Sequence, residues 1–181
     1  PLYVPEDCKT LEEAVKRGAQ DPRIMGIVLG KGDHVVEVLK NTYTCNRRED
    51  LNTLVISSAV KIVGRPDVPK ENIVVVGGIH FKKGIQGNCH LQHMTLRQAK
   101  GSGVVGFSSF TMEDVLVEQC GGYGVYAYNT GGVGRCTNVE VRQCGSSGVV
   151  AANGASITLI GAKTTVHHNC TTGYSGFFGL K

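Results

Sequence analysis

Carboxylates are the side chains of this sequence best suited to acid–base chemistry, and its glycine-rich C-terminal half contains few of them. Residues 91–181 include only Glu113, Asp114, Glu118 and Glu140. Hydrolysis of a glycosidic bond typically needs two carboxyl groups about 5 to 10 Å apart on one surface. Glu118 and Glu140 occupy different positions in the repeating unit of this half of the chain. We therefore predict no catalytic residue here.

The residues equivalent to Glu118 in the neighbouring repeats are Arg97 and Arg142, and His168 follows in the last one. Opposite charges on adjacent strands stabilise a sheet modestly. The sequence therefore predicts a structural column of alternating charge at these four positions.

Histidines are the other candidates for chemistry, as metal ligands. His90 and His93 are three residues apart and flank an apolar residue, which suits chelation poorly in a strand or turn. His167 and His168 are adjacent, so in a strand they point in opposite directions. His80 stands alone, and no Cys/His cluster has the spacing of a zinc site. We predict no metal site and no cofactor.

Aromatic side chains give the strongest indication of a ligand-binding surface. Two columns of the repeat are assigned to the outside of the fold, and they contain Val105, Tyr126, Val150, Phe178 and Phe107, Tyr128, Ala152, Leu180. Exposed apolar patches mark contacts, and aromatic rings combine a large apolar area with specific stacking geometry. We therefore predict binding residues that belong to these columns: Phe107, Tyr126, Tyr128 and Phe178.

A repeat governs the second half of the chain. Residues 96–104 (LRQAKGSGV), 117–125 (VEQCGGYGV) and 141–149 (VRQCGSSGV) align, and residues 167–170 (HHNC) followed by Gly176 give a fourth copy. The amide residue recurs after 21, 24 and 26 positions. Repeats of this length are typical of solenoids. The strand, glycine turn and strand of each copy predict one coil of a parallel β-helix.

Each column of the repeat has an expected structural role. The amide residues are expected to stack as a hydrogen-bonded ladder: Gln98, Gln119, Gln143 and Asn169. The glycines are expected at a corner with positive φ: Gly103, Gly124, Gly148 and Gly176. Two columns are assigned to the interior: Val104, Val125, Val149, Phe177 and Gly106, Ala127, Ala151, Gly179. The last copy fits least well, and a slip of one residue there would turn its side chains to the opposite faces.

A short helix is expected before the first coil. Thr10 is the predicted N-cap, Glu13 completes a capping box, and Gly18 is the predicted stop. The helix should cover the open end of the stack.

The sequence as a whole predicts an all-β fold, a single-stranded right-handed parallel β-helix of five to six coils with an N-terminal capping helix. The N-terminal segment and helix occupy residues 1–23, and the β-helix occupies residues 24–181. Residues 41–50 and 64–72 are polar or proline-containing and are expected to protrude as loops.

The helix, the strand that leads into Gly30-x-Gly32-Asp33 and the glycine-rich coils resemble the right-handed parallel β-helix superfamily, which includes pectate-lyase-like proteins. Over about residues 10–181 the chain is similar to the short-coil repeats of carbohydrate-binding proteins, sugar hydrolases and F-box substrate-recognition proteins. The resemblance implies the fold, which serves enzymes and binding scaffolds alike. The aspartate clusters of pectate lyases, polygalacturonases and alginate epimerases have no counterpart here, which favours a non-catalytic role.

Composition argues against several classes of partner. The formal net charge is +4 and the lysines and arginines are scattered, so no nucleic-acid partner is expected. No run of 18 apolar residues occurs, so no membrane span is expected. The 25 glycines lack a Gly-X-Y period and indicate tight turns rather than collagen.

The chain contains seven cysteines, and Cys120, Cys144 and Cys170 each follow the amide residue of the repeat. We expect free, buried thiols and a reducing, cytoplasmic location. The first residues lack the pattern of a signal peptide. The sequence also lacks an initiator methionine, so we expect a piece of a larger protein from which a signal peptide could have been removed.

We predict a non-catalytic scaffold or binding module for a protein or glycan ligand. Two alternatives stay open: a carbohydrate-active lyase, hydrolase or epimerase, and a structural unit that stacks end to end. The second alternative arises because residues 176–181 end within a strand pattern without a capping helix. It predicts a homodimer through the C-terminal coil that dissociates when Phe177 or Phe178 is charged.

Overall fold

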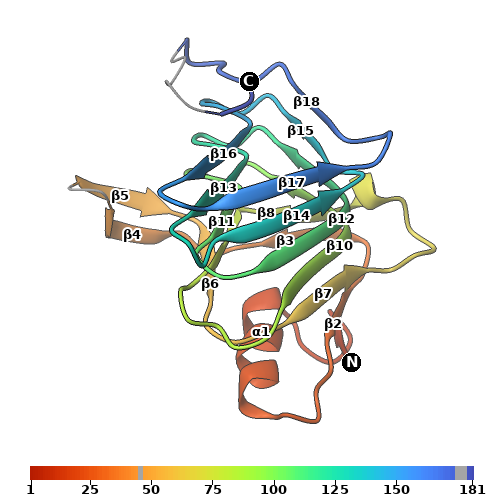
Figure 1. Cartoon of the computed structure of the whole chain (residues 1–181). Coiled ribbons are helices and arrows are strands. Elements are labelled where there is room, and N and C mark those ends of the chain that lie inside the picture. The colour runs from red at the N-terminus through yellow and green to blue at the C-terminus, as the bar shows by residue number, and fades with distance from the viewer. Residues whose placement is uncertain (45–46, 174–178) are drawn as a thin grey trace.

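The structure, a computed structural model, describes residues 1–44, 47–173 and 179–181. Its strands wind into a parallel β-solenoid of about seven turns, more than the five to six that the sequence predicted (Figure 1). The stack begins with a strand that precedes the helix, and sequence analysis had not assigned this strand.

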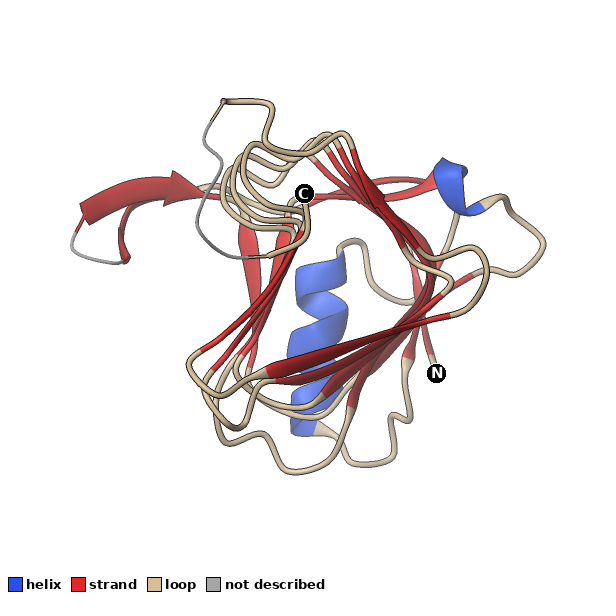
Figure 2. Cartoon of the chain, turned by 45° about the horizontal axis from the view of Figure 1, so that its top comes forward, coloured by secondary structure: helices blue, strands red, loops and turns tan. Residues whose placement is uncertain are grey.

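Three stacks of parallel strands form the sides of the solenoid, as the view in Figure 2 shows. The first side contains β1 (Leu2–Val4), β2 (Ile27–Leu29), β7 (Lys61–Gly64), β10 (Cys89–Arg97), β12 (Phe110–Glu118), β14 (Val133–Thr137) and β17 (Ser156–Ile160). The second side contains β3 (Gly32–Val35), β8 (Ile73–Val76), the C-terminal halves of β10 and β12, β15 (Glu140–Arg142) and β18 (Thr165–His167). The third side contains β6 (Thr53–Ile56), β9 (Gly78–Phe81), β11 (Val104–Gly106), β13 (Val125–Tyr128) and β16 (Val149–Ala152).

The chain bends from the first side to the second at residues with positive φ. His93 (φ 55°) and Asp114 (φ 54°) make this bend inside β10 and β12. Asn138 (φ 52°) makes it between β14 and β15. Asn, Asp and His are among the residues that tolerate this conformation best.

The predicted interior columns are largely confirmed. Val104, Val125 and Ala127 are fully buried between coils. Ala151 is exposed, because no further coil covers it in the described part of the chain. The largest buried side chains include Phe81 and Phe110, whose rings stack with centroids 5.8 Å apart.

The expected roles of the amide and glycine columns are wrong. The glutamines are exposed and adopt positive φ themselves, at 59°, 56° and 58°: Gln98, Gln119 and Gln143. Gly124 has no positive φ but lies so close to the next coil that a Cβ would be 2.2 Å from Cγ1 of Val141. In the described residues, an amide contact between coils occurs instead at another corner, where Nδ2 of Asn153 donates to Oδ1 of Asn129.

The last copy of the repeat is shifted by one residue relative to the sequence alignment. His167 pairs with Arg142, and the backbone N–H of Gln143 donates to the carbonyl of His168. Asn169 therefore lies opposite Cys144, and its Oδ1 accepts a hydrogen bond from the Cys144 N–H at 3.0 Å. The side chain of Asn169 thus replaces a backbone acceptor, and the alignment of Asn169 with the glutamines is wrong.

Among the described residues, no parallel strand follows β16 on the third side. Leu180 forms an antiparallel bridge with Val149 at the outer edge of β16. Gly176, Phe177 and Phe178 lie outside the described residues, so the predictions made for them stay untested.

Helix α1 (Leu11–Gln20) lies across the N-terminal end of the stack, as expected (Figure 2). Thr10 is its N-cap and accepts from the Glu13 N–H at 3.1 Å, while Glu13 accepts from Lys9 rather than from Thr10. Gly18 does not end the helix, which continues to Gln20. No helix in the described ranges is long and apolar enough to cross a membrane.

Both expected loops protrude, and one has regular structure. The segment around 41–50 is an antiparallel hairpin of β4 (Leu39–Thr44) and β5 (Arg47–Leu51). This hairpin projects away from the solenoid in Figure 2. Residues 65–72 form a loop that ends in the 3-10 turn η1 (Lys70–Asn72).

The six cysteines in the described ranges are free; five are buried, Cys170 is half-buried, and Cys45 lies outside those ranges. Burial raises the pKa of Cys136 to about 12, which keeps it a neutral core residue. Contact with Cys144 and burial raise the pKa of Cys120 as well. These thiols are therefore poor nucleophiles.

Candidate ligand-binding face

The outer surface of the third side carries the aromatic residues that the sequence singled out. Parallel pairing aligns Val55, His80, Val105 and Tyr126 in one outward column. Phe107 and Tyr128 lie two residues further along their chains from Val105 and Tyr126, so they face the same way. Phe107, Tyr126 and Tyr128 therefore share one face, as predicted from the sequence.

Five rings form a continuous cluster on this side, which we call the aromatic face: His80, Phe107, Tyr123, Tyr126 and Tyr128. Its ring centroids are 5.2 Å apart for His80–Phe107, 5.5 Å for Phe107–Tyr128, 5.8 Å for Tyr126–Tyr128 and 5.2 Å for Tyr123–Tyr126. Each of the five side chains is half-buried. Part of each of these side chains is therefore accessible to a ligand.

The end of the aromatic columns differs from the prediction. Phe178 lies outside the described residues, so its predicted binding role stays a prediction. Val150 lies in the outward column but is only 2% exposed, because the backbone at Gly179 packs against it. Leu180 is 51% exposed at this edge.

The third side and its flanking turns contain no acidic residue. They comprise residues 52–60, 77–88, 98–109, 119–132 and 143–155, which hold none of the 15 Asp and Glu residues of the chain. Lys82, Lys83 and Lys100 lie in these turns and are exposed. The aromatic face therefore lacks the carboxylate pair that glycoside hydrolysis usually needs.

His80 lies among apolar neighbours in the aromatic face. Its Nε2 is buried and has no hydrogen-bond partner in the described residues. Burial, assisted by the charge of Lys82, lowers the pKa of His80, so the ring is neutral at pH 7. His80 therefore acts here as an aromatic ring rather than as a cation.

The predicted column of alternating charge exists on the second side, with His167 in place of His168. Arg97 Nε donates to Glu118 at 2.9 Å, and Arg142 Nη2 donates to the same carboxylate at 2.8 Å. His167, not His168, continues the column, because of the one-residue shift in the last copy. Its Nε2 lies 2.7 Å from Glu140 Oε2.

Two carboxylates converge on Arg142 in this column. Glu140 Oε2 lies 3.5 Å from Arg142 Nη1, on the other side of the guanidinium from Glu118. The Glu118 side chain is only 6% exposed. Burial raises its pKa, but the hydrogen bonds from Arg142 and Arg97 outweigh burial and lower it overall. Glu118 therefore stays ionised and is unsuited to act as a general acid.

A second ion-pair cluster attaches the 65–72 loop to β10 and β12. Asp114 accepts from Lys70 Nζ and from His93 Nδ1, both at 2.7 Å. His93 Nε2 lies 2.6 Å from the Val68 carbonyl. Both ring nitrogens of His93 therefore face acceptors, which favours the protonated imidazolium.

The stability of this loop should depend on pH. Partial burial lowers the pKa of His93, but hydrogen bonds to Asp114 and Val68 outweigh burial and raise it above the ordinary value. The contact therefore stabilises the fold fully below the unfolded pKa of about 6.5, and this contribution is lost as pH rises through the folded pKa. We expect hydrogen-exchange protection of the Val68 and Asn72 amides, which donate to Arg65 and Pro69, to fall over this range.

A His93→Gln variant is the control for this prediction. Glutamine does not titrate, so protection of the same two amides should become independent of pH once intrinsic exchange rates are divided out. The same fall in protection in wild type and variant would contradict the role of His93.

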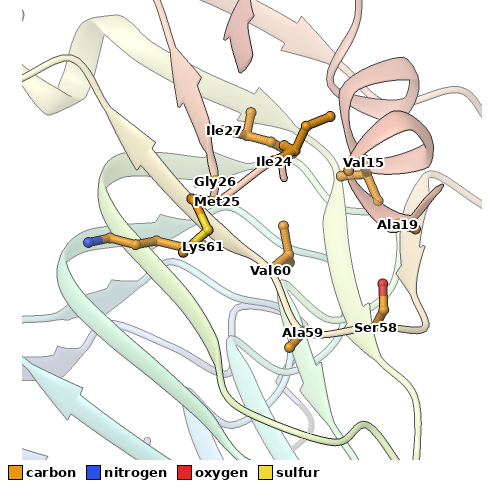
Figure 3. Close-up of a pocket in the computed structure, with 11 residues that line it drawn as sticks. Val15, Ala19, Ile24, Met25, Gly26, Ile27, Ser58, Ala59, Val60 and Lys61 are labelled. Carbon is orange, nitrogen blue, oxygen red and sulfur yellow. The ribbon is translucent and has the colours of Figure 1, made fainter. Parts of the chain in front are cut away.

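Neither the remaining histidines nor the cavities form a second site. His90 contacts Thr111 and Gln92, and no group of three metal-ligating side chains occurs in the described ranges. A cavity of about 30 Å³ lies between α1 and the strands β2 and β7, and Figure 3 shows the residues that line it. That volume is about one water's share of the liquid, whereas ligand pockets start near about 300 Å³. A more open hollow of about 310 Å³ lies beside Met25 and Lys61, and its lining contains no carboxylate, histidine or cysteine.

Two members of the aromatic face, His80 and Tyr123, were not predicted from the sequence. His80 lies one coil before Val105 in the same outward column, but its coil precedes the aligned copies of the repeat. Tyr123 lies in a turn, and its ring reaches Tyr126 across the corner. Extending the alignment one coil towards the N-terminus would have found His80, whereas no sequence periodicity indicates Tyr123.

Comparisons with protein-family models, curated proteins and solved structures found no match for this chain.

Proposed function

We propose that this chain is a non-catalytic β-solenoid binding module whose aromatic face binds a protein or glycan ligand. The observation that carries the proposal is the continuous cluster of five half-buried rings on a side that contains no carboxylate. Contiguous exposed aromatic surface is unusual on a solvated sheet and typically marks a contact.

The surroundings of the aromatic face limit the chemistry of the ligand. Lys82, Lys83 and Lys100 flank the rings, and the absence of acidic neighbours favours a neutral or anionic ligand over a cationic one. Aromatic rings supply apolar area and stacking, and the lysines supply donors at the rim.

We also propose, as the resemblance implies, that the fold belongs to the right-handed, pectate-lyase-like superfamily with short coils. The capping helix and the stacked glycine turns support this assignment. Free, buried thiols favour a reducing compartment such as the cytoplasm.

Removal of two rings should weaken binding without unfolding the protein. Tyr126→Ala combined with Tyr128→Ala deletes two adjacent members of the aromatic face and leaves the core intact. At about 1 kcal/mol for each ring, the Kd for a ligand should rise about thirtyfold. The measurement is retention on an array of neutral, uronate and sulfated glycans and in a pulldown with candidate proteins.

Tyr43→Ala is the matched control, because Tyr43 is 64% exposed on the hairpin, outside the aromatic face. It should bind like wild type. The proposal is wrong if wild type retains no ligand on either screen, or if the double variant binds as well as Tyr43→Ala.

A carbohydrate-active enzyme is a second candidate, favoured by the convergence of Glu118 and Glu140 on Arg142. Glu140 is the more accessible carboxylate, and with His167 it forms an acid–base pair at the surface. The test is release of reducing ends from pectin, alginate and neutral glycans. Turnover by wild type that disappears in Glu140→Gln would establish the enzyme and contradict the non-catalytic proposal.

A further inference from the structure

The two ends of the solenoid differ in how they are closed. At the N-terminal end, helix α1 buries Leu11 and Ala14 against the first coils. At the C-terminal end, β17 is the last strand of the first side, and in the described ranges β14 is its only strand partner. An edge strand of this kind can pair with another chain.

The hydrogen bonds of β17 show which backbone groups face the open edge. The Ser156 N–H donates to Gly132 at 3.0 Å, and the Ile160 carbonyl accepts from Asn138 at 3.0 Å. Alternate residues of a strand present their N–H and C=O to the same side. Ser156 and Ile160 therefore bond to β14, and Ile157 and Leu159 point their backbone groups outwards.

The sequence of β17 lacks the features that protect edge strands. Residues 151–162 contain no charged residue and no proline, and the nearest charged side chain that follows is Lys163. Natural edge strands usually carry lysine, proline or a bulge that prevents pairing with other chains. The side chains of Ile157 and Leu159 face the core but are only partly buried, because no coil covers them in the described part of the chain.

The same end of the solenoid already accepts an antiparallel partner from its own chain. Leu180 donates to the Val149 carbonyl at 2.8 Å and accepts from the Val149 N–H at 3.2 Å. This pairing covers part of the edge of β16 on the third side and leaves the edge of β17 open in the described residues.

We propose that two copies of this chain associate through β17, as antiparallel strands related by a two-fold axis at Thr158. In this register Ile157 lies opposite Leu159 of the second copy, and each such pair exchanges two N–H···O=C bonds. The half-buried side chains of Ile157 and Leu159 then pack against their counterparts. The partner is therefore a second copy of this chain, and the proposal does not depend on the function of the aromatic face.

The closed N-terminal end limits the assembly to a dimer. A head-to-tail stack would need an open coil at both ends, and α1 occupies one of them. Contact between two identical C-terminal ends is self-complementary and closes after two copies.

A charge at the two-fold axis tests this proposal. Thr158→Asp places two carboxylates opposite each other in the dimer, while in the monomer the new carboxylate lies on the exposed face beside Arg135. Like charges facing each other across an interface cost several kcal/mol, so the dissociation constant should rise at least about tenfold. The measurement is sedimentation equilibrium from micromolar to millimolar protein, where wild type should rise from 19.3 kDa towards twice that mass.

Val133→Asp is the matched control, because Val133 is 46% exposed on the inner strand β14. It should dimerise like wild type, and circular dichroism should show all three proteins equally folded. A wild type that stays at 19.3 kDa at every concentration overturns the proposal. So does assembly beyond two copies, or a Thr158→Asp variant that dimerises as tightly as wild type.

Discussion

Gly124→Ala should destabilise the protein by at least about 3 kcal/mol, a large effect for the addition of one methyl group. A Cβ at this position would lie 2.2 Å from Cγ1 of Val141 and 2.6 Å from the carbonyl oxygen of Gly148. The valine can rotate, but the carbonyl belongs to the backbone of the next coil and can move only if the stack opens. For a domain of this size the midpoint of thermal unfolding should fall by about 6 to 12 °C.

Gln119→Gly is the matched comparison, because it places a glycine at the residue of the same turn that has positive φ. Gln119 is exposed at φ 56°, so glycine relieves backbone strain and removes no core contact. We expect stability within about 1 kcal/mol of wild type. Urea unfolding of the two variants measures both effects. Near-native stability of Gly124→Ala, or a loss in Gln119→Gly as large as that in Gly124→Ala, would contradict the close contact as the reason for glycine at position 124.

The sequence predicted the architecture well because the repeat is expressed in side-chain volume. Small and β-branched residues recur at intervals of one coil, and only a stack of parallel strands brings such residues into one column. Val104 and Val125 accordingly pair in register inside the solenoid. The space inside the solenoid restricts the size of the inward side chains in each coil separately, so every copy of the repeat predicts the same stack of coils.

Sequence alignment could not determine the conformation of the turns. The glutamine and the glycine of each turn could both adopt positive φ. Because glycine usually prefers this conformation, the sequence pointed to the glycine, and the glutamine has it instead. The number of coils was also underestimated, because β1 has three residues and lies before the helix. A strand of that length has too few residues to show a period.

In the last copy, a side-chain oxygen takes the place of a backbone carbonyl as hydrogen-bond acceptor. Aligning Asn169 with the glutamines matched amide to amide, but its Oδ1 instead accepts from the Cys144 N–H. Because of this shift of one residue, His167 occupies the position in the charged column that was predicted for His168. Side-chain similarity is therefore a poor guide to register where a side chain takes over a backbone hydrogen bond.

The candidate site was predictable in part, for a related reason. Phe107, Tyr126 and Tyr128 share a face because alternation along a strand fixes their direction. Tyr123 joins them from a turn, where direction depends on φ and ψ values that the sequence does not specify. The converging pair Glu118 and Glu140 also escaped prediction, since the two residues occupy different columns and meet only through the long side chain of Arg142.

Phe110→Ala should destabilise the protein by about 3 to 5 kcal/mol, the usual cost of removing a fully buried phenylalanine. Phe110 is 1% exposed and stacks on Phe81. Its ring occupies the space that side chains at Gly106 and Gly134 would fill, since a Cβ at these positions would lie 2.3 and 2.4 Å from ring atoms. Neighbouring coils are held apart by their backbone hydrogen bonds, so the cavity cannot collapse and the full cost should appear in urea unfolding.

Phe107→Ala tests the same substitution three residues away, at a side chain on the outside of the solenoid. Phe107 is half-buried in the aromatic face and loses only ring contacts with His80 and Tyr128, so stability should fall by about 1 kcal/mol or less. Binding on the glycan or protein screen should nevertheless weaken, because the ring belongs to the proposed contact. A solenoid whose inner phenylalanine determines stability and whose outer phenylalanine determines binding is what a binding scaffold requires. Equal stability losses in the two variants would mean that the aromatic face is part of the core and would contradict its assignment as a ligand surface.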